Sequence, residues 1–312
     1  MVPDNTRHIL VTGSHRSATT FTAKILSLDS SLGYINEPFN VDSGMEGLKH
    51  WFQYIEEGMD DGGYYNELVH NLLTGNASFK RTPYIRKQGL FKNIAKYFLK
   101  SKSNYLYKLA TINPLKNRYL IKDPIACLSS LYLSTKYHMD VVMLIRHPAS
   151  FCASIKRLNW RFDFNEFKSQ PLLMDHYLGD ILNGHDISSL NIVTEAALVW
   201  KCLYTVLFDF IENDKSIIAI KHESVSQNPV KEFRHLYNRL GLHYNDKVER
   251  KIIDLTSSSN IVMPENNIAH EFKRSSKLIS SAWKKSLTQQ EVDTIYQITS
   301  DLSASYYADS EW

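Results

Sequence analysis

The sequence contains little cysteine and no long apolar run. Its 312 residues include three cysteines, which are far apart: Cys127, Cys152 and Cys202. Three scattered thiols are too few for a disulfide framework or a cysteine-based metal site. We therefore expect the three cysteines to be reduced residues of the core. No run approaches the roughly 18–20 apolar residues of a membrane span, and the first residues do not form a signal peptide. These absences predict a cytoplasmic protein.

The sequence also shows no internal repeat and no linker rich in proline and glycine. Hydrophobic residues make up 43% and charged residues 22%, as is ordinary for a globular chain. A chain of this length can bury one large core. We therefore expect a single domain over residues 1–312.

Acidic residues are missing from one stretch. Residues 80–118 hold eleven of the 36 basic residues and none of the 33 acidic ones. Such asymmetry indicates an anionic partner. The stretch belongs to an insertion expected at 74–118, where 90–98 fits an amphipathic basic helix. Three interpretations stay open: a groove for an acidic glycan, a surface resting on anionic lipid, or a solvated lobe. No nucleic-acid module appears, so we expect no nucleic-acid partner.

Short apolar runs alternate with helical patterns along the chain. Strands are expected at 8–12, 33–36, 119–122, 141–145 and 217–220. Helices are expected at 20–28, at 45–73 with a break near 62–63, at 195–212, and after a capping box at 288–291. This order predicts an α/β, P-loop-like three-layer fold with a parallel sheet of about five strands between helices.

The loop after the first strand lacks the lysine of a nucleotide-kinase loop. Against the pattern G-x-x-x-x-G-K-[ST], Ala18 replaces the second glycine and Thr19 replaces the lysine. Backbone amides and a helix N-terminus still form an anion cradle. The cation stands inside the loop, as Arg16. This arrangement suits a ligand with one 5′-phosphate rather than three.

A second anion site is predicted far downstream. Arg146 ends the fourth strand, and Pro148 opens a helix that carries Ser154 about two turns later. A guanidinium at the carboxyl end of a strand fits phosphate oxygens. An ordinary kinase does not explain a second anion site of this kind.

Together these motifs resemble those of the sulfotransferase family, of the bacterial or carbohydrate type. Residues 16–20 match the 5′-phosphosulfate loop [RK]-S-G-T-[TS] except at Ala18, and Arg146 with Ser154 matches the 3′-phosphate motif. The resemblance spans about residues 8–300. It implies 3′-phosphoadenosine 5′-phosphosulfate (PAPS) as donor, adenosine 3′,5′-bisphosphate (PAP) as product, and no metal.

The resemblance also implies the residues that bind the donor. Phe21 would contact the adenine, His222 stands where the family often has a tyrosine near it, and 274–276 resembles a loop that closes over the 3′-phosphate. The full set is Gly13, Ser14, His15, Arg16, Ser17, Ala18, Thr19, Thr20, Phe21, Arg146, Ser154, His222, Arg274 and Ser275.

Sulfuryl transfer needs a base for the acceptor hydroxyl and cations near the departing phosphate. Arg16 is the expected electrostatic partner. Glu37 follows the second strand, so it is the favoured base, with His15 and His147 as alternatives. Lys122, after the third strand, is a candidate second cation.

The predicted function is therefore sulfuryl transfer from PAPS to a hydroxyl of a carbohydrate or glycolipid. Residues 156–161 would add to the acceptor wall, and 80–118 would contact the inner face of an anionic membrane. Two alternatives remain: a P-loop kinase acting on ATP, and a non-catalytic protein that binds PAP.

Overall fold

The computed structural model describes residues 7–59, 63–81, 101–114, 116, 118–183, 186–187, 189–256 and 281–312. The predicted donor residues Arg274 and Ser275 lie outside these ranges, as does most of the basic stretch 80–118.

The centre of the fold is a five-stranded sheet in the order β2-β3-β1-β4-β5, and every neighbouring pair is parallel. The strands are β1 Ile9–Gly13, β2 Leu32–Asn36, β3 Arg118–Lys122, β4 Asp140–Ile145 and β5 Ile218–Lys221. Each boundary lies within one residue of the predicted one, so the predicted sheet is confirmed. Because all strands run the same way, the loops that follow them meet at one edge.

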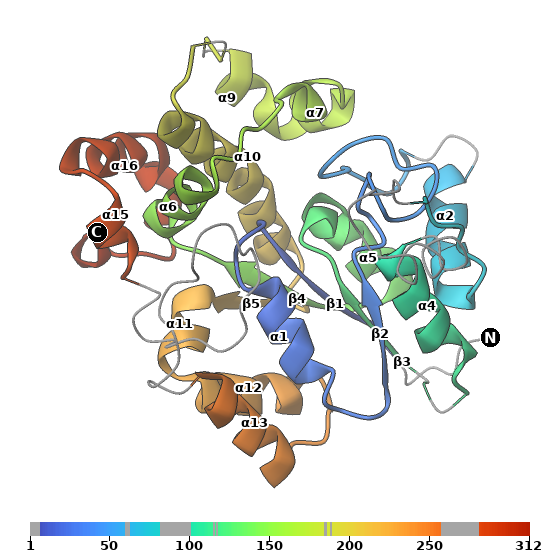
Figure 1. Cartoon of the computed structure of the whole chain (residues 1–312). Coiled ribbons are helices and arrows are strands. Elements are labelled where there is room, and N and C mark those ends of the chain that lie inside the picture. Colours follow the sequence, from blue (N-terminus) through green and yellow to red (C-terminus); the bar gives the residue numbers. More distant parts are fainter. Residues whose placement is uncertain are drawn as a thin grey trace, which may run out of the picture.

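Both faces of the sheet are covered by helices (Figure 1). Ile9 and Val11 of β1 pack into a core with α1 (Thr19–Leu26), α12 (Pro229–Arg239) and α13 (Asp246–Thr256). Leu10 points to the opposite face, where α6 (Pro148–Leu158) and α10 (Ile192–Asn213) form a second core. This burial on both faces explains why the strands are almost continuously apolar.

The two long C-terminal helices match the predicted pattern. The side chain of Asn191 accepts hydrogen bonds from two first-turn amides of α10, and Trp200 in its middle is fully buried. In α16 (Gln289–Ser303) the predicted capping box between Thr288 and Glu291 is present. This helix packs against α10 and α6.

The prediction of a helix from residue 45 was wrong for its first part, because α2 spans only Tyr64–Thr74. Residues 45–59 form an irregular segment in which Phe52 has a φ of 59°. Its amides are held by distant side chains: Trp51 N–H donates to Glu166 at 2.8 Å, and Tyr54 N–H donates to Gln170 at 2.8 Å. Such long-range contacts outweigh local helical periodicity.

The remaining short elements connect this framework. They are α4 Lys102–Ile112, η1 Ile125–Ser129, α5 Ser130–Tyr137, α7 Asn165–Lys168, α8 Pro171–Leu173, η2 Met174–Leu178, α9 Gly179–Asn183, α11 His222–Gln227, α15 Trp283–Ser286 and η3 Asp309–Glu311. All three cysteines are buried and free, as expected. None of the helices in the described ranges is both long and apolar enough to span a bilayer.

Candidate active site

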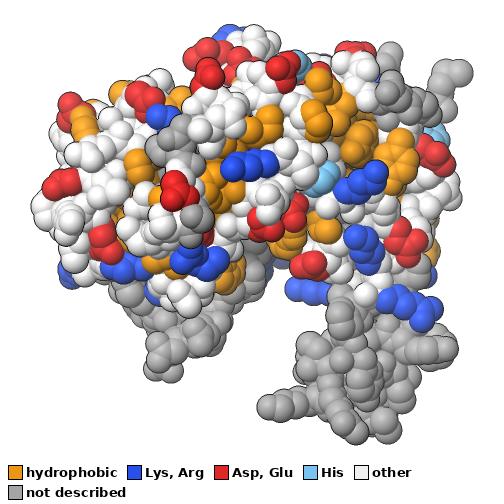
Figure 2. Space-filling model, turned by 90° about the horizontal axis from the view of Figure 1, so that it is seen from above, with side chains coloured by type: hydrophobic (Ala, Val, Ile, Leu, Met, Phe, Trp, Pro, Cys, Tyr) orange, Lys and Arg blue, Asp and Glu red, His pale blue; other side chains and the backbone are white. Residues whose placement is uncertain are grey.

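A cavity of about 990 Å³ opens where the loops after β1, β2, β4 and β5 meet. Its walls include Arg16 after β1, Glu37 after β2, Arg146 after β4 and His222 after β5. The helices α6 and α10 complete it. Seen from above, the surface of the molecule carries hydrophobic, basic and acidic side chains side by side (Figure 2). The cavity therefore gathers segments that the sequence separates widely.

The loop after β1 is shaped by left-handed backbone. Arg16 and Ala18 have φ of 69° and 67°, so the chain turns sharply before α1 begins at Thr19. Ala18 stands at the N-cap of α1 and makes no side-chain cap. The first-turn amides of a helix have no partner within the helix, and here no side chain caps them. Thr19 and Thr20 line the cavity, so this end of α1 fits an anion.

Three residues of the loop support it from beneath. A Cβ at Gly13 would lie 2.3 Å from the Leu144 carbonyl oxygen, so only glycine fits there. Ser14 and Ser17 are buried and bond each other at 2.6 Å, and Ser14 also bonds the Tyr204 hydroxyl at 2.9 Å. These three residues are absent from the cavity lining, whereas His15, Arg16, Ala18 and Phe21 belong to it.

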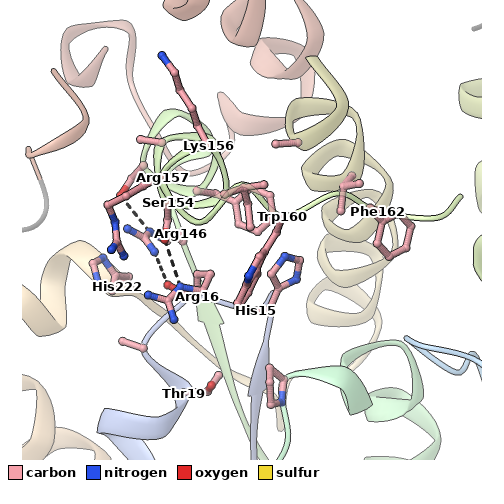
Figure 3. Close-up of a pocket in the computed structure, with 18 of the residues that line it drawn as sticks. His15, Arg16, Thr19, Arg146, Ser154, Lys156, Arg157, Trp160, Phe162 and His222 are labelled. Carbon is pink, nitrogen blue, oxygen red and sulfur yellow. Dashed lines mark hydrogen bonds between the residues drawn. The ribbon is translucent and has the colours of Figure 1, made fainter. Parts of the chain in front are cut away.

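Arg146 and Ser154 join the two predicted phosphate motifs in one place (Figure 3). Arg146 is 8% exposed; its Nε donates to Ser150 Oγ at 2.9 Å and its Nη1 donates to the Arg16 carbonyl. Ser154 Oγ accepts from Arg16 Nε at 3.2 Å. Trp200 Nε1 donates to the Arg146 carbonyl at 2.9 Å and fixes the backbone there. The uncapped helix end and these guanidinium groups fit a ligand with two phosphate positions.

Glu37 lines the same cavity as the loop after β1, at the edge of the sheet where it was expected. Its φ is 47°, and its amide donates to the Lys122 carbonyl at 2.8 Å. Its carboxylate pairs with the Lys122 ammonium and accepts from Asn40 Nδ2 at 3.3 Å. Lys122 is 2% exposed and is not part of the lining. The lysine therefore lies behind Glu37 and holds its carboxylate in place.

Asp123 stabilises the turn next to this pair. Its carboxylate accepts from Phe39 N–H at 2.6 Å and from Ile125 N–H at 2.9 Å. Burial, reinforced by the nearby Glu37 charge, raises the pKa of Asp123 to about 7. The buried carboxyl group of Asp123 thus holds the segment that follows Glu37, through Phe39, and the turn after β3, through Ile125.

The two candidate histidine bases occupy different places. His15 lines the cavity, and burial together with Arg16 and Arg146 lowers its pKa to about 3, so the ring is neutral near pH 7. His147 is not part of the lining; its ring stacks on Trp283 with the centroids 5.3 Å apart and touches Tyr307 and Trp312. Its Nδ1 accepts from Ala149 N–H at 3.2 Å and caps α6. His147 is thus positioned as a structural residue.

The side of the cavity beyond Arg16 is an aromatic wall, defined here as Trp51, Phe52, Trp160 and Phe162. Trp160 is 42% exposed, and the Arg16 guanidinium lies 5.7 Å from its ring centroid. The sequence prediction included Trp160 but missed the other three, because their proximity depends on long-range packing.

Two carboxylates that were not predicted from the sequence hold this wall. Glu195 of α10 pairs with Arg161 at 2.7 Å and accepts from Phe162 N–H at 2.7 Å. Glu166 binds the Trp51 amide. Both carboxylates line the cavity. Within the described ranges, no group of three or more His, Cys, Asp or Glu side chains is arranged to hold a metal ion.

Two further predicted contacts lie at the other end of the cavity. Phe21 lines it and meets Phe233 edge-on, with the ring centroids 5.6 Å apart. His222 begins α11, is 6% exposed and lies 3.5 Å from the Glu223 carboxylate. An aromatic ring and an imidazole thus flank the space next to the phosphate motifs.

Fold and site together define an α/β protein with a phosphate-binding loop and a second anion site in one cavity. The model of the sulfotransferase family matches residues 8–246, so the chain belongs to this family. It is a PAPS-dependent sulfotransferase.

Several solved structures are similar to this chain. The sulfotransferase domain from the curacin biosynthetic pathway is similar over 96% of this chain and 98% of its own, at 15% identity and a TM-score of 0.50. Two others are the sulfotransferase domain of the Synechococcus PCC 7002 olefin synthase (14% identity, 95% and 97% covered, TM-score 0.44) and mouse sulfotransferase SULT7A1 complexed with PAP (12%, 98% and 86%, TM-score 0.47). A comparison with curated protein sequences gives no significant match.

Proposed function

We propose that this sulfotransferase modifies a hydroxyl group of a carbohydrate, either free or as the headgroup of a glycolipid. One observation carries the proposal: a single cavity contains both phosphate motifs, the carboxylate of Glu37 and the aromatic wall. The donor end and the acceptor end thus meet at Arg16 and Glu37.

The donor end consists of two groups of side chains. Arg16, Thr19 and Thr20 bind the 5′-phosphosulfate, and Arg146 and Ser154 bind the 3′-phosphate. Phe21 and His222 flank the adenine, in line with their places in the lining. When bound, PAPS supplies the sulfuryl group, and the Arg16 guanidinium offsets the negative charge that develops on the phosphate. A contribution from Arg274 and Ser275 stays a prediction.

Glu37 accepts the proton of the acceptor hydroxyl. It lines the cavity, and its two carboxylate oxygens are held by Lys122 and Asn40. A fixed carboxylate is what general-base catalysis requires. We assign Lys122 as a positioning residue that acts through Glu37 rather than as a second cation at the donor.

The acceptor end suits a sugar. Pyranose rings carry apolar C–H faces that pack on aromatic rings, and Trp160 presents an exposed ring next to Arg16. Hydroxyl groups need polar partners, which Glu195, Arg161 and the neutral His15 supply at the same wall.

The described part of the basic stretch supports the glycolipid form of the acceptor. On α4, Tyr105, Leu109 and Ile112 are exposed and recur at helical spacing, with Lys102 and Lys108 on the same helix. Apolar and basic side chains on one exposed helix favour contact with anionic lipid. Flotation with vesicles that contain anionic lipid, at low and high salt, tests this contact.

The proposed function is tested in two stages. Calorimetry should show that PAP binds more tightly than ATP; the opposite order would remove the donor assignment. Radiolabelled sulfuryl donor is then offered with glycans, glycolipids and phenols. Transfer to carbohydrate hydroxyls supports the acceptor class, and exclusive transfer to phenols would overturn it.

A further inference from the structure

Arg157 lies on the same face of α6 as Ser154. It follows Ser154 by three residues, a spacing that places two side chains next to each other on a helix. It also lines the cavity. In Figure 3 its side chain extends toward Arg146 and His222, while Lys156 points away from them. From the sequence, Arg157 was expected at the acceptor wall, whereas in the structure its side chain extends toward the donor end.

Lys156 and Arg157, which are neighbours on α6, differ in whether other residues of the protein bind their charged groups. The Lys156 ammonium pairs with Glu291 at 2.7 Å and lies 3.4 Å from the Ser286 carbonyl oxygen. Within the described ranges, the Arg157 guanidinium makes no hydrogen bond or ion pair with another residue. Its N–H donors are therefore available to a ligand in the cavity.

Among the described residues, Arg146 and Ser154 supply few free donors for a terminal phosphate. Arg146 already directs Nε to Ser150 and Nη1 to the Arg16 carbonyl. Ser154 offers a single hydroxyl, whose oxygen accepts from Arg16. A 3′-phosphate monoester carries up to two charges and three free oxygens, so a second guanidinium from the same helix would match it.

We infer that Arg157 binds the 3′-phosphate of the donor and thereby selects nucleotides that carry this group. The inference rests on the proposed donor site. It adds a specificity-determining residue to Arg146 and Ser154, and it separates Arg157 from the acceptor wall.

The test compares two nucleotides on the full chain by calorimetry. Arg157→Ala should weaken PAP binding about tenfold or more, as expected for a lost charge-assisted hydrogen bond, and leave adenosine 5′-monophosphate binding unchanged. Arg157→Lys should recover part of the PAP affinity. Lys168→Ala, on α7 and outside the cavity lining, is the control and should bind both nucleotides as the parent protein does. Because Arg157 is exposed, melting temperatures should stay equal.

The comparison of PAP with adenosine 5′-monophosphate separates failure of the inference from failure of the proposed donor site. If Arg157→Ala binds PAP normally, or weakens both nucleotides equally, Arg157 is no 3′-phosphate ligand. If the parent protein does not prefer PAP to adenosine 5′-monophosphate, the proposed donor site itself fails, and the inference fails with it.

Discussion

Ser154 Oγ accepts a hydrogen bond from Arg16 Nε at 3.2 Å across 138 residues of sequence. Arg16 belongs to the loop after β1, and Ser154 belongs to the helix after β4. The two phosphate motifs therefore touch before any ligand arrives, and the orientation of one side chain depends on the other. If both residues bind the donor as proposed, this contact couples donor affinity to the position of the Arg16 guanidinium at the sulfuryl group.

Substitution of Ser154 should consequently affect both binding and turnover. In the proposed site, Ser154→Ala removes one ligand of the 3′-phosphate and one partner of Arg16, so we expect PAP affinity and kcat each to fall by about threefold to tenfold. Calorimetry and steady-state kinetics measure the two effects. Ser305→Ala, exposed just after α16, serves as control. Loss of affinity with normal kcat would show that Ser154 does not orient Arg16.

Glu37→Gln should separate donor binding from chemistry. The amide keeps the size of the side chain but cannot take the hydroxyl proton, so kcat should fall by about 10²–10⁴-fold while PAP binds normally. Glu57→Gln, which is exposed, should have no effect. Turnover within a factor of two of the parent enzyme would exclude Glu37 as the base.

Ala18→Gly should stabilise the protein. Ala18 has a φ of 67°, a conformation that costs an L-residue about 1 kcal/mol relative to glycine. Part of the gain is lost because glycine makes the unfolded chain more flexible. We expect a small rise in the urea midpoint with unchanged PAP affinity. A lower midpoint would show that the Ala18 methyl group makes favourable contacts.

Stability should fall in mild acid because of His147. Burial lowers the pKa of His147 to about 4, whereas an unfolded histidine titrates near 6.5. Neutral His147 therefore stabilises the fold above pH 6.5, and this contribution, up to about 3 kcal/mol, is lost as the pH falls toward 4. In His147→Asn the asparagine can still cap α6. Melting curves from pH 7.5 to 5 should show a shallower pH dependence than in the parent protein, and equal slopes would contradict this.

The sequence was sufficient to predict the five strands of the sheet, but not the conformation of every segment packed around them. Strands such as β4 are buried on both faces, so apolar runs and the residues that end them mark their bounds locally. The segment around Phe52 was predicted as a helix because its periodicity is helical. Its conformation is instead set by Glu166 and Gln170, which are far away in sequence.

The same distinction holds within the site. Arg16, Arg146 and Ser154 were recognisable because their spacing relative to strands and helices carries the signal. No local pattern marks Phe162 or Glu195 as parts of one wall. Lys122 was expected at the donor, but the sequence could not show that its ammonium is buried behind Glu37.

The aromatic wall comes from segments outside the sheet, whereas the donor motifs sit directly on its strand ends. On the proposed assignment, changes at Trp51 or Phe162 therefore alter the shape offered to the acceptor without moving the residues that bind the nucleotide. For protein engineering, the aromatic wall is therefore a surface that can be redesigned for other acceptors while the donor motifs stay unchanged.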